Sequence, residues 1–596
     1  MKKSIFFTAG TLASLVWLLS GCSGSSLFGT DRSDDTSPST EVKHSTPTVS
    51  ARHLQVRIAP GQPLEKAYAL PDADTFRLDG APKGMRILPD GTVVWTPTQD
   101  QNGTWRVTIE ADRGSDRLLN DTLTVHVENG SLTYDGLFVD PTGSGSAADD
   151  GTPQHPYHDF ETACAHRGTL QRIYLRGGLY RNPGWGQLTR TPTRFPAIQK
   201  CAGTAQNPIV VRPWGNEYVT LATDALYGLK IKESAQHIVV EGLEIVGMAN
   251  ALTHEEVLKQ WWNASDTIKT IGISVNGDHV TVRNNIIHHM PGSGISVAKA
   301  VAAHIEGNIV YDCDWWTISG SSGIGITQAR EAADSTGRTE NVIEENLIFG
   351  VEQRIFSRVW NKSFATLTID EGEAFLIQEG KDTGDSVANY RGQYRIANNL
   401  IAYNGKSGVI NMAKNVTIEH NSYYQNGTLT RQGGFRINKS PNITLRNNAV
   451  AAPADTLILS VGGSDQPTAS DNYITGGKDR SLPDGFERVS DGLFVDAAGG
   501  DFATTDAVPD GVGVDPDLLK TMRTRLARYR IRIQPTGYRV DPAAMTRAII
   551  DHRPAGSSVD TQHLHDADPY VIIENLPAGH PAGSRFKLYV PHYASD

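Results

Sequence analysis

The chain has 596 residues, of which 39% are hydrophobic and 20% are charged, and its formal net charge is −11. These values are typical of a soluble globular protein that is long enough for several domains. The acidic balance argues against a generic polyanion-binding surface, so an anionic ligand would have to meet a local basic patch or a bridging cation. The sequence also lacks a Gly-rich phosphate loop, a nucleophile elbow and a nucleic-acid motif, and no nucleic-acid partner is expected.

The first residues predict the compartment. Two lysines precede an apolar run over residues 5–19, which is too short for a membrane span and is typical of a signal peptide. The Leu-Ser-Gly-Cys sequence that ends at Cys22 resembles the lipobox of bacterial lipoproteins. This resemblance implies a signal peptide over residues 1–22, palmitate on Cys22, and a lipid anchor in the outer membrane of a Gram-negative bacterium, on its periplasmic or its surface face. Residues 23–52 have too few apolar side chains to fold and are expected to be a flexible linker.

The sequence pattern of residues 53–130 is typical of a separate small domain. Strand-like runs alternate with Pro, Gly and Asp turns, which predicts a β-sandwich. The segments Gly80-Ala-Pro-Lys-Gly-Met and Gly103-Thr-Trp-Arg-Val-Thr resemble bacterial immunoglobulin-like, cadherin-related repeats. That resemblance implies a spacer or a carbohydrate-binding accessory, of which the spacer is the favoured interpretation.

The middle of the chain repeats one short phrase, for example Val-Thr-Val-Arg-Asn-Asn-Ile-Ile at 280–287 and Arg-Ile-Ala-Asn-Asn-Leu-Ile at 395–401. The alternation of apolar and polar residues indicates strands with one buried face, and such coils bury that face only by stacking on one another. Asparagine tolerates the left-handed conformation of a tight corner, so a stacked ladder of amides is expected there. The equivalent asparagines are Asn285, Asn308, Asn346, Asn399, Asn421, Asn448 and Asn472.

The start of this region predicts a particular kind of solenoid. Leu137-Phe-Val-Asp-Pro-Thr-Gly, then Ile173-Tyr-Leu-Arg-Gly-Gly, and a helix-like segment near 160–166 resemble the opening of right-handed parallel β-helix proteins of the pectate lyase-like superfamily. The resemblance implies an all-β chain with a right-handed parallel β-helix over residues 131–510. It also implies a carbohydrate-active protein, because polysaccharide lyases, glycoside hydrolases, epimerases and non-catalytic surface proteins share this fold.

Three cysteines follow the lipobox. An oxidising compartment permits a disulfide between Cys164 and Cys201, which flank the start of the predicted β-helix. Cys313 is expected to be buried and inert.

The richest insertion, residues 349–379, combines Arg354, Arg358 and Lys362 with several carboxylates. A uronate lyase needs such a mixture, because a cation must neutralise the substrate carboxylate while a base removes the neighbouring proton. Arg354, Arg358 or Lys362 is therefore the candidate base or carboxylate clamp. The oxygen ligands for Ca²⁺ would be Asp370, Glu371 and Glu373. The alternative is a solvated face on which these charges form salt bridges.

A second cluster, Asp312-Cys-Asp314-Trp315-Trp316, ends a repeat phrase. Paired carboxylates beside indoles suit a sugar subsite, with Asp314 as a catalytic candidate and Asp312, Trp315 and Trp316 in substrate binding. Trp360 and Tyr424 are further stacking candidates, and His288-His289 offers a base. The alternative for the aromatic residues is burial inside the solenoid.

Residues 511–596 are predicted to cap the open end of the solenoid with an arginine-rich amphipathic helix. The resulting functional hypothesis is a polysaccharide lyase that cleaves an acidic, uronate-containing glycan by β-elimination. A glycoside hydrolase or transglycosidase, and a non-catalytic glycan-binding surface protein, are the alternatives.

Overall fold

A computed structural model describes residues 53–590, apart from residues 144, 184, 186–195, 263–267, 319, 333–337, 361–363, 380–389, 481, 491, 565–568 and 579–582. The predicted signal peptide, Cys22, the linker and Lys362 therefore lie outside the described residues. Within the described part, no helix is both long and apolar enough to cross a membrane.

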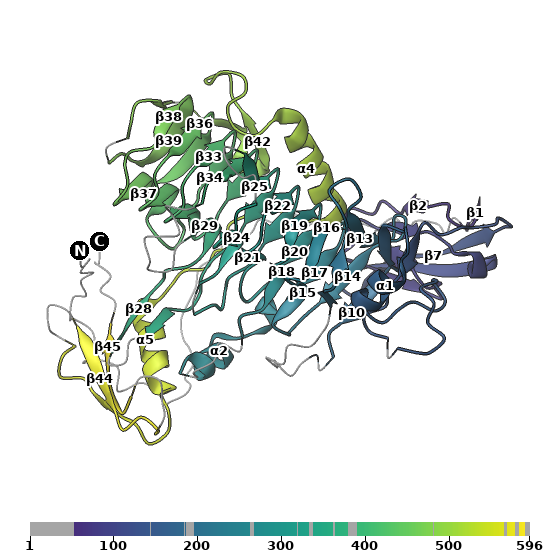
Figure 1. The fold of residues 1–596 in the computed structure, drawn as a ribbon, viewed down its shortest axis with the longest axis horizontal. Coiled ribbons are helices and arrows are strands. Elements are labelled where there is room, and N and C mark those ends of the chain that lie inside the picture. Colours follow the sequence, from purple (N-terminus) through teal and green to yellow (C-terminus); the bar gives the residue numbers. More distant parts are fainter. Residues whose placement is uncertain are drawn as a thin grey trace, which may run out of the picture.

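Three rows of parallel strands form the right-handed β-helix (Figure 1), in which strands of successive coils pair within each row. The first row is β8 (Gly136–Phe138), β9 (Arg172–Leu175), β13 (Ile209–Pro213), β16 (Ala235–Glu241), β19 (Asp278–Arg283), β22 (His304–Glu306), β25 (Thr339–Glu344), β30 (Gln393–Ala397), β33 (Val416–Glu419), β36 (Ile443–Arg446) and β38 (Thr468–Ser470), with β12 (Cys201–Ala202) beside β16. The second row is β10 (Gly178–Arg181), β14 (Val219–Ala222), β17 (Glu244–Val246), β20 (Ile286–His288), β23 (Ile309–Tyr311), β26 (Leu347–Phe349), β31 (Leu400–Ala402), β34 (Ser422–Tyr424), the start of β37 (Ala449–Gly462), β39 (Asn472–Lys478) and β40 (Phe486–Arg488). The third row is β11 (Ala197–Ile198), β15 (Tyr227–Ile231), β18 (Ile271–Val275), β21 (Ile295–Ala298), β24 (Ser322–Thr327), β29 (Glu373–Gln378), β32 (Lys406–Asn411), β35 (Gln432–Asn438) and the end of β37.

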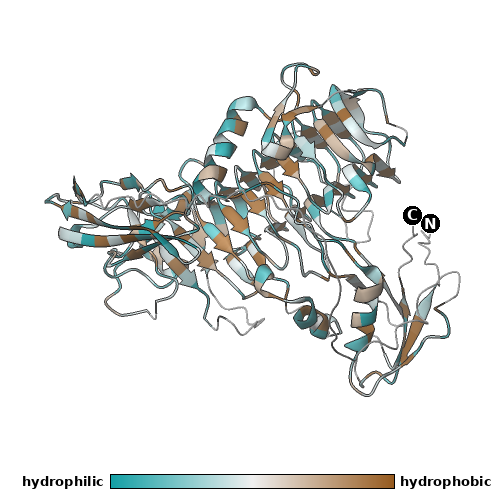
Figure 2. Ribbon diagram, turned by 180° about the vertical axis from the view of Figure 1, so that it is seen from behind, coloured by the Kyte–Doolittle hydropathy of each residue, from teal (hydrophilic) through white to brown (hydrophobic). Residues whose placement is uncertain are grey.

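The repeat phrase explains these rows. Its apolar positions point inward and form one continuous core from Val139 to Ile474. Many of the solenoid strands are accordingly brown in the hydropathy view (Figure 2). Each coil buries its apolar face against its neighbours, as a stacked solenoid requires. The predicted all-β class, with a β-helix that follows a small β-sandwich, is confirmed.

The predicted asparagine ladder lies inside the corner between the first and second rows. Each side-chain amide donates to the amide oxygen one coil further on, at 3.1 Å from Asn285 to Asn308 and 3.0 Å from Asn308 to Asn346. The series continues through Asn399, Asn421 and Asn448 to Asn472. The residue before each amide turns the corner with a positive φ, as Asn284 and Gly307 do. A shorter ladder joins Asn404 to Asn426 at 2.9 Å at the next corner.

Asn346→Ala is expected to lower the free energy of unfolding by about 1–3 kcal/mol, because it leaves buried backbone and amide groups of three coils without partners. Asn346 donates to the carbonyl of Ile305 and to Asn399, and it accepts from Asn308. Urea unfolding measures the change. Asn438→Ala is the matched control, since this amide bonds to Asn411 on the outer surface; an equal loss in both variants would contradict the role of the ladder.

The N-terminal module is a two-sheet sandwich. One sheet has the order β1 (Leu54–Ile58), β7 (Asp116–Val127), β6 (Gly103–Arg113) and β3 (Thr75–Asp79), and the other has β2 (Leu64–Ala67), β5 (Thr92–Trp95) and β4 (Arg86–Ile87), with a 3-10 turn at Gln99–Gln101. Trp95, Val107 and Leu123 belong to the core between the sheets.

This module is fixed against the first coils of the solenoid. The Arg176 guanidinium and the Glu217 carboxylate form a buried ion pair at 2.8 Å, and Arg176 also donates to the carbonyl of Lys83 in the module. Asn216 donates to the carbonyl of Leu64 at 2.9 Å. The module is therefore a packed neighbour of the solenoid, whatever further role it has.

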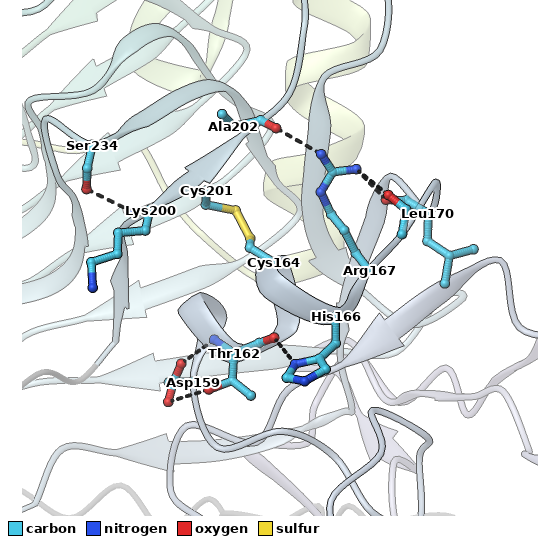
Figure 3. The surroundings of a disulfide bond; sticks show 11 residues. Asp159, Thr162, Cys164, His166, Arg167, Leu170, Lys200, Cys201, Ala202 and Ser234 are labelled. Carbon is cyan, nitrogen blue, oxygen red and sulfur yellow. Dashed lines mark hydrogen bonds between the residues drawn. A yellow bond between two sulfur atoms is a disulfide. The ribbon is translucent and has the colours of Figure 1, made fainter.

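A short helix, α1 (Phe160–His166), begins the solenoid. Asp159 caps it by accepting from the backbone N–H of Thr162 at 2.7 Å. Figure 3 shows the disulfide that joins Cys164 on this helix to Cys201, whose Cα atoms lie 5.4 Å apart. Cys313 is free and buried.

The C-terminal segment runs back along the side of the solenoid. After β41 (Phe494–Asp496), the 3-10 turn Ala497–Gly499 and β42 (Asp501–Thr504), helix α4 (Pro516–Tyr529) covers apolar residues of the second row (Figure 1). The expected position over the open end was wrong in this respect, because α4 packs on a lateral face. Its arginines connect parts of the chain: Arg530 donates to the carbonyl of Leu70 in the module, and Arg528 pairs with Glu65 at 3.3 Å.

A side lobe is built from insertions and the last strands. It contains the 3-10 turn Ala249–Ala251, α2 (His254–Trp261), α5 (Pro542–Asp551) and a five-stranded sheet in the order β27 (Ser357–Trp360), β28 (Phe364–Thr368), β45 (Arg585–Tyr589), β44 (Tyr570–Glu574) and β43 (Ser558–Asp560). Trp261, Phe356 and Phe586 share its core. The insertions that contain candidate site residues therefore also help to build the side lobe.

Candidate active site

Several predicted residues meet where the second row turns into the third. β23 ends at Tyr311, so Asp312 begins the turn that leads to β24. In the next coil, residues 350–356 begin the corresponding turn and bring Arg354 beside Asp312. The corner forces Asp312 into the left-handed region, with φ of 52°.

Asp312 lies among titratable side chains. Its carboxylate is 3.8 Å from Nε2 of His289, the residue at the same corner one coil earlier. The two side chains remain about a quarter and a fifth exposed, at 24% and 21%. The Asp312–His289 pair is therefore held at the ends of rigid strands and is still accessible to solvent.

Burial sets the protonation of this pair. It raises the pKa of Asp312 to about 6, although Arg354 and His288 oppose the shift. It lowers the pKa of His289 to about 4, with the charges of His288 and Arg354 acting in the same direction. Near neutral pH, Asp312 is thus close to its own pKa while His289 stays a neutral imidazole, and an acid–base group works best with a pKa near the working pH.

Arg354 is the positively charged residue of this cluster. Its guanidinium lies over the Trp315 indole, 3.4 Å from the ring centroid, and 4.9 Å from the ring of Tyr538. It pairs with Glu352 at 3.4 Å. Nε of Arg354 is buried with no partner among the described residues.

The C-terminal segment completes this cluster. Thr536 and Thr428 donate hydroxyl hydrogen bonds to the carboxylate of Glu352, at 2.5 and 3.0 Å. Tyr538 donates to the carbonyl of Arg354 at 2.9 Å. Burial raises the pKa of Glu352, and these donors and Arg354 oppose that rise.

A second, buried group lies behind the first one. Asp314 accepts from the backbone N–H of Gly372 at 2.7 Å, and Glu373 accepts from the Lys406 ammonium at 3.1 Å. Glu371 accepts from the backbone of Gly320 and Ser321. Burial raises the pKa of all three carboxyls, that of Glu373 to about 7. Asp314 is fully buried, so its predicted direct role in catalysis is not supported by its position.

The three carboxylates proposed as calcium ligands do not converge. The side chain of Asp370 is 55% exposed, Glu371 is occupied by backbone donors and Glu373 faces Lys406. In the described residues, no group of three or more His, Cys, Asp or Glu side chains could hold a metal ion. These residues therefore do not fit the expected Ca²⁺ site.

The predicted stacking residues are mostly core. Trp316 belongs to the core of the side lobe and donates to the carbonyl of Ala249 at 2.7 Å. Trp315 is covered by Arg354, and Tyr424 packs edge-on against Phe502 under the C-terminal segment. Trp315 and Trp316 are buried, as the alternative for these aromatic residues expects, whereas Tyr424 is only partly buried. Arg358 and Trp360 lie on β27, but their side chains are outside the described part of the structure.

Two aligned columns of the third row, called the polar track below, carry mostly polar or small side chains, with Leu376 and Val409 as apolar exceptions. The central column, in register from coil to coil, is Lys230, Ser274, Ser296, Gly325, Leu376, Val409, Arg436 and Ser460. The column beside it is Ala298, Thr327, Gln378, Asn411, Asn438 and Gly462. Over these positions the only charged side chains are Lys230 and Arg436, and none is a carboxylate.

Sequence comparison places the middle of the chain in a class: residues 271–474 match the family model of a right-handed β-helix region. No curated protein matches the sequence. Among solved structures, the A-module of the mannuronan C-5 epimerase AlgE4 from Azotobacter vinelandii is 12% identical, with 56% of this chain and 95% of that chain covered and a TM-score of 0.27. The GH136 lacto-N-biosidase from Eubacterium ramulus is 15% identical over 57% and 56% of the two chains, with a TM-score of 0.27. Tailspike protein 2 from the Escherichia coli O157:H7 bacteriophage CAB120 is 10% identical over 72% and 48%, with a TM-score of 0.28. These likenesses concern the fold alone.

Glu352 and Tyr538 were not singled out from the sequence, and His289 was given only as an alternative base. A signal for His289 existed. It lies four residues after Asn285, and Asp312 lies four residues after Asn308, so alignment on the ladder stacks the two side chains. Nothing in the sequence indicates that Tyr538 meets Arg354.

Proposed function

We propose that the protein is a polysaccharide lyase that cleaves an acidic glycan by β-elimination at the Asp312 cluster, defined as Asp312, His289, Arg354 and Glu352. The observation that carries the proposal is a partly exposed carboxylate with a pKa of about 6 that feels the charge of the mostly buried Arg354 guanidinium. This pair matches the two requirements of elimination, a base for the C5 proton and a cation for the uronate carboxylate.

In this reaction Arg354 neutralises the carboxylate of the sugar, which makes the C5–H bond acidic. The proton passes to Asp312 while a double bond forms between C4 and C5. The C4–O bond then breaks, and the leaving oxygen takes up a proton. The polar track supports an acidic substrate, because it offers two cations, hydroxyls and amides without carboxylate repulsion.

A glycoside hydrolase is the second candidate, and one observation favours it. Asp312 and Glu352 both have raised pKa values and belong to one cluster, in which Glu352 pairs with Arg354, and hydrolysis needs two such carboxyls as acid and base. The two reactions require opposite states of Asp312, since elimination needs the carboxylate and hydrolysis needs the acid.

The test incubates the full-length protein in detergent with a panel of acidic polysaccharides between about pH 4 and pH 9. For a lyase, ultraviolet absorbance of the unsaturated product should appear, and the rate should rise as pH passes about 6 because Asp312 becomes ionised. A parallel incubation with a chelator tests whether a metal ion helps Arg354 to neutralise the carboxylate of the sugar.

Reducing ends without unsaturation, at a rate that falls above about pH 6, would replace the lyase by the hydrolase. Saturable binding without either product would leave a glycan-binding protein. The predicted lipid anchor at Cys22 is a separate proposal, tested by mass spectrometry of the mature N-terminus and by Cys22→Ser, which should release the protein from membranes.

A further inference from the structure

Four titratable side chains form a chain across successive coils beside the candidate site. Nε2 of His288 lies 3.3 Å from Oε1 of Glu244, and Nδ1 of His288 lies 2.6 Å from Nδ1 of His289. Nε2 of His289 then faces Asp312 at 3.8 Å. The chain thus leads from the exposed corner at Asp312 to Glu244 on β17.

The Glu244 end of the chain is well anchored. Thr220 donates to Oε2 of Glu244 at 2.5 Å, and His288 occupies the other oxygen. Burial raises the pKa of Glu244, but the hydrogen bond and charge of His288 outweigh it and leave this pKa below its usual value. Glu244 is therefore a fixed negative charge at the far end of the chain of side chains.

Hydrogen-bond chemistry allows few proton arrangements here. The Nε2 that faces Glu244 must carry hydrogen, and the two Nδ1 atoms can hold only one hydrogen between them. When that hydrogen is on His288, His289 is neutral with its hydrogen on Nε2, directed at Asp312. When it is on His289, Nε2 of His289 is bare and accepts from protonated Asp312.

We infer that Glu244, His288 and His289 form a proton relay for Asp312, in which Glu244 and His288 are positioning residues. The inference rests on the proposed acid–base role of Asp312. In the transfer, the O–H bond of Asp312 and the Nδ1–H bond of His289 break, while an Nε2–H bond of His289 and an Nδ1–H bond of His288 form. The transfer leaves Asp312 as the carboxylate that elimination requires, and the positive charge that it places on His288 lies against Glu244.

The neighbouring groups are consistent with this assignment. The Tyr311 ring stacks on His288 at 4.8 Å, and burial raises the pKa of Tyr311, so this phenol stays neutral. Arg354 opposes a charge on His289. The neighbouring titratable and charged groups that act on the chain are Tyr218, Tyr311, Tyr529, Glu352 and Arg354, and the charges of Arg525 and Arg528 act on Tyr529.

The test is nitrogen-15 NMR of the full-length protein with labelled histidine, in which the His289 signals are identified by their loss in His289→Gln. In the wild type at about pH 7.5, His289 is expected to carry its hydrogen on Nε2. Glu244→Gln removes the charge that holds a second proton on His288, so hydrogen should move to Nδ1 of His289. The same variant should raise the pH midpoint of turnover by about one unit, because Asp312 then retains its proton longer.

Glu241→Gln is the matched control. Glu241 lies three residues away, is similarly buried at 13% exposed, and pairs with Arg283 on the first row at 2.6 Å. Its substitution makes the same change of charge and should leave His289 unaltered. A His289 tautomer that is the same in wild type, Glu244→Gln and Glu241→Gln would overturn the relay.

The NMR measurement of the His289 tautomer needs no substrate. An inactive protein would therefore refute the proposed function, while the tautomer would still decide whether the relay exists. His288→Gln, which removes the middle ring, gives a second test if Glu244→Gln does not fold: an unchanged His289 tautomer in that variant also overturns the relay.

Discussion

Asp312→Asn is expected to lower turnover of the acidic glycan about 10²–10⁴-fold, the usual contribution of one acid–base group. The amide has nearly the shape of the carboxyl but can neither accept the C5 proton nor deliver one. Because the side chain is partly exposed and lies at a corner, the thermal melt should change little. Initial rates at saturating substrate, with the melting curve of the same preparation, measure both quantities.

Asp370→Asn is the control for this prediction. Asp370 is an aspartate of the neighbouring turn, is more than half exposed and lies 3.9 Å from Lys406. The control should retain wild-type turnover, with or without added calcium. If Asp370→Asn were inactive and Asp312→Asn active, the reaction would belong to the insertion highlighted in the sequence.

Glu217→Ala is expected to lower the free energy of unfolding by about 3–5 kcal/mol, because it leaves the buried charge of Arg176 unpaired. The carboxylate side chain is fully buried and accepts from both Nε and Nη2 of Arg176, at 2.9 and 2.8 Å. The backbone N–H of Gly177 also donates to it, at 2.5 Å. Urea unfolding followed by circular dichroism measures the loss.

Glu65→Ala removes an ion pair of the same module that is half exposed, between Glu65 and Arg528. Its expected cost is about 0–1 kcal/mol, since solvent screens such a pair. A loss for Glu217→Ala no larger than that for Glu65→Ala would show that Arg176 finds other partners, and that the module is held by apolar contacts instead.

The sequence predicts the parts of the fold that depend on neighbouring coils. Every asparagine in the ladder repeats the same local phrase, so its position follows from the repeat alone. The stacking of His289 and Asp312 could be obtained in the same way. Contacts such as Tyr538 with Arg354 join segments that share no repeat, and no local pattern encodes them.

The aromatic predictions fail for a related reason. Trp315 and Trp316 lie in a turn that a bare solenoid would expose, and the sequence pattern leaves a sugar subsite and burial inside the molecule as alternatives. They are covered because the side lobe and Arg354 pack over them. Whether an indole in an insertion is exposed to solvent depends on segments that are distant in the sequence, here on strands near the C-terminus.

The pairing of β28 with β45 also constrains the order of folding. Phe364 lies opposite Lys587, so a sheet begun by the middle of the chain cannot close until residues 585–589 have been synthesised. Coils of the solenoid need only their neighbours and can assemble progressively, whereas this closure has a long loop and is slow. A newly synthesised chain should therefore pass through a state in which the solenoid is formed and the lobe is open, with Trp261 and Phe356 still accessible to chaperones. Shortening the protein by its final strand would trap it in that state.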